Sequence, residues 1–223
     1  MKQIPFENLD VRRNIPIYLN LATIYEKIVH HKRGGFCYEV NGLFHWLLVT
    51  LGFQAQLVAA TVKRPNGVWA KTDTHVGIIV HINDKQYLVD VGFGASPLFP
   101  VPINGKEHTD TGGTYKVVKQ DMQYYDLMKK EDEDWRTLYR FDRSEKDLVD
   151  FHEGCVFNQV AKDSSFTHSD LVTLPTHDGR LTLSGYSLTE ESNGISKKRV
   201  LTATEKKEVL KELFGIDLSS TRS

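Results

Sequence analysis

The chain is poor in cysteine, has no long apolar run and carries no excess of charge of either sign. Only two of its 223 residues are cysteines, Cys37 and Cys155, whereas a secreted domain held by disulfides normally has more. No apolar segment reaches the roughly 20 residues of a membrane span, and the first residues lack the apolar stretch of a signal peptide. These absences predict a cytoplasmic protein with reduced thiols and no membrane association.

The charges are balanced, because 28 Lys and Arg residues face 29 Asp and Glu residues for a formal net charge of -1. Without a global field, nothing attracts the chain to nucleic acid or to anionic lipid. The sequence also has no internal repeat, no low-complexity segment and no His, Cys or acidic residues at metal-ligand spacing. What remains is chemistry on a small molecule, with no metal and no nucleic-acid partner.

The first quarter of the chain has the apolar period of helices. Apolar residues at i, i+3, i+4 and i+7 predict a helix over about 20–29, capped by Asn20. The glycine pair Gly34-Gly35 interrupts the pattern. A second helix follows and ends near Gly52. One face of this helix is predicted to be an apolar stripe, which consists of Phe44, Leu47, Leu48 and Leu51.

Beyond Gly52 the apolar period changes to two, which is typical of strands. Strands are predicted at 54–62, 75–82, 86–91, 115–118, 124–128 and 135–141, and the turn Asn83-Asp84 joins the second to the third. This region is predicted to be an antiparallel barrel or curved sheet. A helix over about 145–156, a hairpin of 171–174 with 180–183, and a final helix capped by Thr202 and Glu205 complete the chain.

Three residues of complementary chemistry follow one another at gaps of 38 and 15 residues. Cys37 lies at a predicted helix start, where free N–H groups and the helix dipole favour thiolate and can stabilise an oxyanion. The predicted hairpin brings His75 and Asp90 toward each other. Each residue alone is more often structural, and Cys155, among apolar neighbours, is predicted to be an inert core residue. Together, Cys37, His75 and Asp90 predict a thiol nucleophile with its base and an orienting carboxylate.

The segments 4–9, 33–44, 74–76 and 89–94 resemble the arylamine N-acetyltransferase family, and the similarity continues through 165–167 and Gly179-Arg180. The resemblance implies an α+β fold of the cysteine-protease-like type. It divides the chain into a helical region (1–52) with the cysteine, an antiparallel β-barrel (53–143) with the histidine and aspartate, and an α/β lid (144–223). It also implies that Glu7 and Arg33 pair to hold the N-terminal segment against the catalytic loop.

The resemblance further implies an acetyltransferase that uses acetyl-CoA as co-substrate. The thiolate takes the acetyl group, CoA leaves, and an aromatic amine, hydrazine or hydroxylamine then collects the acetyl group. Cys37 is expected to be the nucleophile, His75 the base and later the acid, and Asp90 the orienting group. The remaining expected contacts are, for CoA, Gly92, Phe93, Gly94 and Thr167, and for the flat amine, Phe36, Thr74, Phe93 and Phe166.

Two alternatives remain open at this stage. Family members usually carry an additional helical unit before the Ile4-Pro5-Phe6 segment, so either the start of this sequence is misassigned or truncated, or the chain is a shortened member. Loss of helices that pack beside the Cys37 helix would expose apolar surface there. A member so shortened could bind CoA or a partner without turnover. A thiol hydrolase or transglutaminase-like enzyme is the second alternative, because the same three residues serve amide chemistry.

Overall fold

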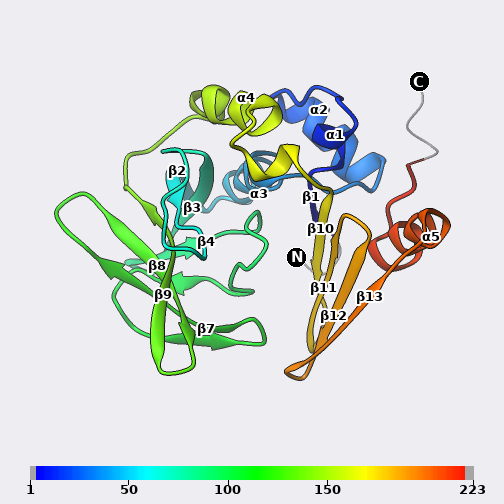
Figure 1. Cartoon of the computed structure of the whole chain (residues 1–223). Coiled ribbons are helices and arrows are strands. Elements are labelled where there is room, and N and C mark those ends of the chain that lie inside the picture. The colour runs from blue at the N-terminus through cyan, green and yellow to red at the C-terminus, as the bar shows by residue number, and fades with distance from the viewer. Residues whose placement is uncertain (1–3, 219–223) are drawn as a thin grey trace.

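A strongly curved antiparallel sheet of eight strands forms the middle of the chain (Figure 1), in a computed structural model that describes residues 4–218. The strand order is β5-β4-β3-β2-β9-β8-β7-β6, and β5 at one edge contacts β7 near the other, so the sheet forms a nearly closed barrel. The strands are β2 (Gln54–Val62), β3 (His75–Ile82), β4 (Lys85–Val89), β5 (Val101–Pro102), β6 (His108–Asp110), β7 (Gly113–Lys119), β8 (Tyr125–Glu131) and β9 (Asp134–Phe141).

The turn between β3 and β4 is the one that the sequence predicts. Asn83 and Asp84 both have positive φ, at 47° and 61°, a conformation that Asn and Asp tolerate better than other residues with side chains. The two strands then pair antiparallel from Ile82 and Lys85 to Ile78 and Val89. This register brings the residue after β4, Asp90, toward the start of β3, where His75 lies.

The helical region contains α1 (Leu9–Arg12), α2 (Leu21–Tyr25), a π-helical turn η1 (Glu26–His30) and the longer α3 (Cys37–Thr50). The predicted first helix is confirmed, and the Asn20 side chain accepts a hydrogen bond from the Thr23 N–H at 3.1 Å. The predicted apolar stripe of α3 is wrong in part. Phe44 and Leu48 pack on the core, but Leu47 and Leu51 are 41% and 65% exposed.

The exposed side of α3 forms part of an apolar groove, as expected beside the Cys37 helix. The groove lies between α3 and the preceding helical segment. Side chains that line it and are more than a third exposed are Ile4, Tyr25, Val29, Trp46 and Leu47.

The last region combines a short helical segment with a second sheet. Its elements are the 3-10 turn η2 (Leu148–Phe151), α4 (His152–Val160), the 3-10 turn η3 (Ser165–Thr167), β10 (Leu171–Pro175), β11 (Gly179–Ser184), β12 (Ser187–Ser192), β13 (Ile195–Val200) and α5 (Ala203–Phe214). The predicted hairpin and the capped final helix are confirmed. The predicted helix at 145–156 is displaced toward the C-terminus. The strands β12 and β13 were not predicted, because β13 is exposed along its whole length and has no apolar alternation.

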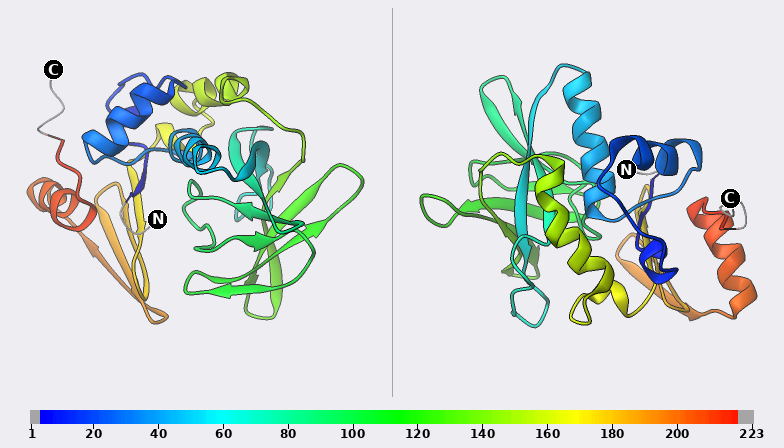
Figure 2. Two further views of the ribbon diagram at one scale, coloured as in Figure 1. Left: turned by 180° about the vertical axis from the view of Figure 1, so that it is seen from behind. Right: turned by 90° about the horizontal axis from the view of Figure 1, so that it is seen from above.

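The five-stranded sheet has the order β1-β10-β11-β12-β13, so β1 (Phe6–Glu7) from the N-terminal segment pairs with the lid strand β10. Figures 1 and 2 show α1 to α4 gathered at one side of both sheets, whereas α5 covers the face of the second sheet that lies away from the barrel. The predicted α+β fold with a barrel and a lid is confirmed. The division at 1–52, 53–143 and 144–223 stays a prediction.

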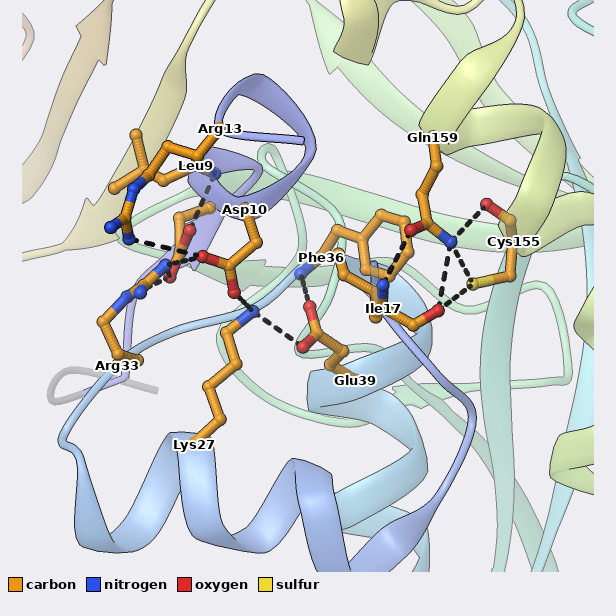
Figure 3. A network of polar contacts seen from close by, with 11 residues as sticks. Leu9, Asp10, Arg13, Ile17, Lys27, Arg33, Phe36, Glu39, Cys155 and Gln159 are labelled. Atoms are coloured by element: carbon orange, nitrogen blue, oxygen red, sulfur yellow. Dashed lines mark hydrogen bonds and ion pairs between the residues drawn. The ribbon is translucent and has the colours of Figure 1, made fainter. Parts of the chain in front are cut away.

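A buried network of charges attaches the N-terminal segment to the loop before α3 (Figure 3). Arg33, whose side chain is 2% exposed, donates to Glu7 at 2.8 Å and to Asp10 at 2.9 Å. Lys27 joins Asp10 at 2.8 Å to Glu39 at 2.7 Å. The Glu7–Arg33 pair expected from the family resemblance is thus confirmed as a buried ion pair.

Close backbone contact accompanies these ion pairs. The Glu7 N–H donates to the carbonyl of Gly35 at 3.0 Å. A Cβ atom on Gly34 would lie 2.0 Å from the carbonyl oxygen of Pro5, which is far inside van der Waals contact. Only glycine therefore allows the two segments to approach so closely.

We predict that Arg33→Met lowers the free energy of unfolding by about 3–5 kcal/mol, because it leaves the buried carboxylate of Glu7 without its cation and Asp10 with Lys27 alone. Urea unfolding measures this loss. The control is Arg136→Met, which removes an exposed pair with Glu131 and should cost at most about 1 kcal/mol. Equal losses in the two variants would contradict a special role for the buried network.

Candidate active site

Cys37 is the first residue of α3 and is 2% exposed. Glu39 fixes this helix start, since its carboxylate accepts a hydrogen bond from the Phe36 N–H at 3.1 Å while Lys27 holds the other oxygen. The segment after Asp90 packs directly on the cysteine. A Cβ atom on Gly92 would lie 2.7 Å from the Cys37 Cα, so glycine is required there.

His75 and Asp90 are in contact, as the hairpin predicts. The His75 Nε2 donates to the Asp90 Oδ2 at 2.8 Å, and the two side chains are 3% and 0% exposed. This bond leaves Nδ1 as the ring nitrogen that can receive a proton. His75 and Cys37 line one cavity, although no hydrogen bond joins the sulfur to the imidazole among residues 4–218. Catalytic hydrogen bonds are often formed only once substrate is bound.

Asn41 is a part of the site that the sequence reasoning did not single out. It lies on α3, and its Nδ2 donates to the other oxygen of Asp90 at 2.9 Å and to the Val76 carbonyl at 2.7 Å. Its Oδ1 accepts from the Val91 N–H at 2.9 Å. The signal was present in the sequence, because Asn41 follows Cys37 by one helical turn and therefore faces the same side.

The electrostatics keep Asp90 ionised. Burial alone would raise the pKa of this carboxyl, but the charge of His75 and the hydrogen bonds from His75, Asn41 and the Gly92 N–H outweigh burial and lower the pKa. The Gly92 bond measures 2.8 Å. Asp90 is thus a permanent acceptor that fixes the imidazole and can stabilise its protonated form.

The thiol itself is not ionised by its surroundings. Burial, followed by the charge of Asp90, raises the pKa of Cys37 well above its usual value, and the backbone N–H groups of Tyr38 and Val76 offset this only in part. The expectation that a helix start lowers this pKa is therefore wrong for the resting thiol, because the cost of desolvation exceeds the benefit of the N–H groups. Thiolate has to form by proton transfer to a base.

The cavity beside Cys37 contains most of the expected contact residues. Its lining includes Thr74, Gly92, Phe93, Gly94 and Phe166. Phe36 and Thr167 are not part of this lining. Phe36 is fully buried behind Phe166, with ring centroids 6.3 Å apart. The Thr167 hydroxyl donates to the carbonyls of Ala161 and Ser164 at 3.0 and 2.9 Å. The roles of these residues stay predictions.

Two cavity residues come from α4, which the sequence reasoning did not connect with the site. Phe157 lines the cavity, and Asn158 also donates to the Thr74 carbonyl at 3.0 Å. Arg64, after β2, lies at the cavity edge and donates to the carbonyl of Asp163 at 3.1 Å. No local signal marks these positions, because each reaches the site only through long-range packing. Cys155 on the same helix is 1% exposed, which agrees with a core residue.

Within residues 4–218, no group of three or more His, Cys, Asp or Glu side chains is arranged to hold a metal ion. No helix in that range is long and apolar enough to cross a membrane. A buried cysteine at a helix start, with a histidine at the start of one barrel strand and a carboxylate just after the adjoining strand, defines the class of cysteine-protease-like thiol enzymes.

Comparison with known proteins narrows this class. The sequence profile of the N-acetyltransferase family matches residues 1–222. The chain is 32% identical to the arylamine N-acetyltransferase pineal gland isozyme NAT-10 of Gallus gallus, in an alignment of 246 positions that covers 98% of this chain and 84% of the relative. The chain therefore belongs to the arylamine N-acetyltransferase family.

Solved structures agree with this assignment. An arylamine N-acetyltransferase of Bacillus cereus with a Cys-His-Glu catalytic triad has a TM-score of 0.92 at 31% identity, covering 97% of this chain and 87% of that one. The Mycobacterium marinum enzyme in complex with CoA has a TM-score of 0.89 at 28% identity, covering 99% and 84%. In the present chain the carboxylate that contacts the histidine is an aspartate, Asp90.

We predict that Asp90→Asn lowers the rate of acyl transfer by about a thousandfold or more, because the imidazole loses its orienting charge. Steady-state turnover measures the loss. Asp126→Asn is the matched control, since Asp126 is also buried but pairs with Arg140 away from the cavity. Similar losses in both variants, or full activity of Asp90→Asn, would contradict the assigned role.

A second prediction concerns Glu39 and pH. Burial, only partly offset by Lys27, raises the pKa of Glu39 from 4.5 to about 7. Between these values the folded state binds more protons than the unfolded state, so this carboxyl stabilises the fold at low pH and the effect is lost as pH rises toward about 7. The loss of this effect lowers the Tm of the unmodified chain as the pH rises from about 5 to about 8. We expect the Tm of Glu39→Gln to fall less over the same range, because glutamine does not titrate.

Thermal unfolding at a series of pH values tests this prediction. Glu205→Gln is the control, because Glu205 occupies the same position at the start of α5 but is only partly buried there, and its pKa is lowered by hydrogen bonds from Thr202. Its Tm profile over the same range should parallel that of the unmodified chain. A Glu39→Gln profile that also runs parallel would contradict the prediction.

Proposed function

We propose that this chain is an acetyl-CoA-dependent arylamine N-acetyltransferase that works through an acetyl thioester on Cys37. The observation that carries the proposal is the 2.8 Å hydrogen bond from His75 to the ionised Asp90. His75 and the buried Cys37 line the same cavity. Family membership supports acyl transfer as the reaction, and the CoA complex of the Mycobacterium marinum relative supports CoA as the carrier.

In the first half-reaction, the proton of the Cys37 thiol moves to the Nδ1 of His75 as the sulfur attacks the thioester carbon of acetyl-CoA. A tetrahedral intermediate forms, and N–H groups at the start of α3 are suited to its oxyanion. When the intermediate collapses, the bond from carbon to the CoA sulfur breaks. His75 returns the proton to the departing CoA thiolate, and Cys37 keeps the acetyl group.

In the second half-reaction, the amine nitrogen of the acceptor attacks the acetyl-cysteine carbon. His75 accepts the amine proton, the carbon–sulfur bond of the thioester breaks, and the proton returns to the Cys37 sulfur. Phe93 and Phe166 in the cavity lining offer apolar surfaces to a flat aromatic acceptor. An aromatic amine or hydrazine fits this description, and Gly92 to Gly94 remain the proposed backbone contacts of CoA.

The alternatives receive less support. A degenerate member without turnover would have no need for an orienting carboxylate that is kept ionised by hydrogen bonds from three groups. A thiol hydrolase is disfavoured because the matching family transfers acyl groups to amines. Both cysteines are free, and a reduced nucleophile suits the cytoplasm, which we propose as the location.

We predict that the chain gains one acetyl group when incubated with acetyl-CoA in the absence of an amine, because the reaction stops at the acetyl-cysteine. Intact-mass spectrometry detects the adduct, and an added arylamine should remove it. Cys37→Ala should abolish the adduct, whereas the control Cys155→Ala, at the other buried cysteine, should keep it. An adduct that persists in Cys37→Ala, or peptide cleavage without CoA, would overturn the proposal.

A further inference from the structure

His75 lies at an end of β3 that the sheet supports on one side. β3 pairs with β2 as far as His75, which lies opposite Ala60. Its pairing with β4 ends earlier, at Ile78 opposite Val89, so in the described part of the chain residues 74–77 have no strand beside them on the β4 side. Buried carbonyls left without donors there would cost free energy and would let the backbone shift. The position of the imidazole therefore depends on groups outside the sheet.

Two asparagine side chains replace the missing strand partner. Asn41 on α3 donates its Nδ2 to the carbonyl of Val76 at 2.7 Å. Asn158 on α4 is 4% exposed and donates its Nδ2 to the carbonyl of Thr74 at 3.0 Å. The carbonyls directly before and directly after His75 are thus held by amide groups from two different helices.

The face of α4 that carries Asn158 packs closely on the residues before His75. Gly154 lies one turn earlier in α4, and residues four positions apart share one face of a helix. A Cβ atom on Gly154 would lie 2.8 Å from the carbonyl oxygen of Asp73 and 3.5 Å from the Cα of Thr74. This face therefore has a glycine where the two backbones come close, and an amide where a carbonyl needs a donor.

The backbone of Asn158 is itself fixed. Asn158 lies in the last turn of α4, which ends at Val160, where main-chain carbonyls have no partner within the helix. The hydroxyl of the buried Ser164 donates to the Asn158 main-chain carbonyl at 3.2 Å and lies 3.4 Å from its Oδ1. A substitution of the Asn158 side chain therefore removes the contact with Thr74 and leaves the bond to the main-chain carbonyl in place.

The segment that Asn158 holds is a tight turn. Asp73 has a positive φ of 57°, and its N–H donates to the hydroxyl of Thr61 at 3.1 Å. The hydroxyl of Thr74 donates to the carbonyl of Lys71 at 2.7 Å. These bonds fix the beginning of the turn, whereas Asn158 fixes its last carbonyl, which belongs to the peptide group that joins Thr74 to His75.

We propose that Asn158 is a positioning residue for His75, whose imidazole reaches Cys37 only while the Thr74 carbonyl is held. This inference rests on the proposed function, in which His75 exchanges a proton with Cys37. Asp90 fixes the Nε2 side of the ring, and Asn158 fixes the backbone from which the ring extends. Asn158, His75 and Cys37 line one cavity. A displacement of about 1 Å within such an arrangement can lower a rate about a hundredfold.

Alkylation of Cys37 by iodoacetamide tests this inference without CoA or turnover. The rate is measured over a range of pH by mass spectrometry of the peptide that contains Cys37. Asn158→Leu, which is similar in size but has no donor, should lower the rate at pH 7 about tenfold or more. It should also shift the rise of the rate to higher pH, because thiolate then forms with less help from His75. Asn158→Ala removes the same donor without a branched side chain and should show the same changes.

The next residue of α4 provides a matched control. The Gln159 side chain accepts a hydrogen bond from the Ile17 N–H at 2.8 Å and donates to the Ile17 carbonyl at 3.1 Å (Figure 3). Gln159 does not belong to the cavity lining. Gln159→Leu therefore removes amide hydrogen bonds from the same helix and should lower Tm at least as much as Asn158→Leu. Its alkylation rate should stay within about twofold of the unmodified value, because the contact with Thr74 is intact.

Steady-state acetylation of an arylamine adds a second readout. Asn158→Leu should lower kcat about tenfold or more and change KM for the amine less than about twofold, because proton transfer is impaired and the aromatic walls of the cavity are intact.

Three results would overturn the inference. These are an alkylation profile that is unchanged in both Asn158 variants, an equal loss of rate in Gln159→Leu, or a raised KM with unchanged kcat. An acetyl adduct on the unmodified chain, together with unchanged alkylation in the Asn158 variants, would leave the proposed function standing and overturn this inference alone. Conversely, alkylation of Cys37 that depends on Asn158, without any acetyl adduct, would support this inference and contradict the proposed function.

Discussion

The buried carboxylate of Asp90 is the contact on which the geometry of the site depends. Hydrogen bonds reach it from three directions: from His75 at the start of β3, from Asn41 on α3, and from the Gly92 N–H in its own loop. A charge buried so completely is tolerable only if all of these donors are in place. The helix that presents the cysteine, the strand that presents the histidine and the loop that covers both are therefore positioned by one group.

The second charge cluster serves the other side of the same helix. Arg33 and Lys27 connect Glu7 and Asp10 in the N-terminal segment with Glu39 in the first turn of α3. β1, which contains Glu7, is also a strand of the lid sheet. The cluster thus links the second sheet to the start of α3, so that β1 and Cys37, which both contribute to the cavity, are held by a common set of ion pairs.

The sequence predicts those parts of the molecule that depend on local chemistry. Alternating apolar residues locate β2 and β3. The Asn83-Asp84 turn sets the register of β3 with β4, and that register brings Asp90 toward His75. The polar strands β12 and β13 cannot be predicted in this way. β13 has no alternation of apolar residues, and it is a strand because its backbone pairs with that of β12. Phe157 and Asn158 escape it as well, since α4 reaches the cavity only through packing between distant segments.

The sequence predicts that the pKa of the Cys37 thiol is lowered, whereas burial in the folded chain raises it. The burial of Cys37 depends on long-range packing and could not be predicted from the sequence. A helix start favours thiolate only where water or other partners help to stabilise it, and Cys37 is almost fully buried beside a negative charge. An isolated cysteine here would be less reactive than one in water. In the proposed function, reactivity arises as a pair of charges, when the proton passes to His75 and Asp90 stabilises the resulting imidazolium. The same carboxylate that opposes ionisation of the thiol alone favours ionisation of the thiol and the imidazole together, so the nucleophile is activated only when the whole arrangement is intact.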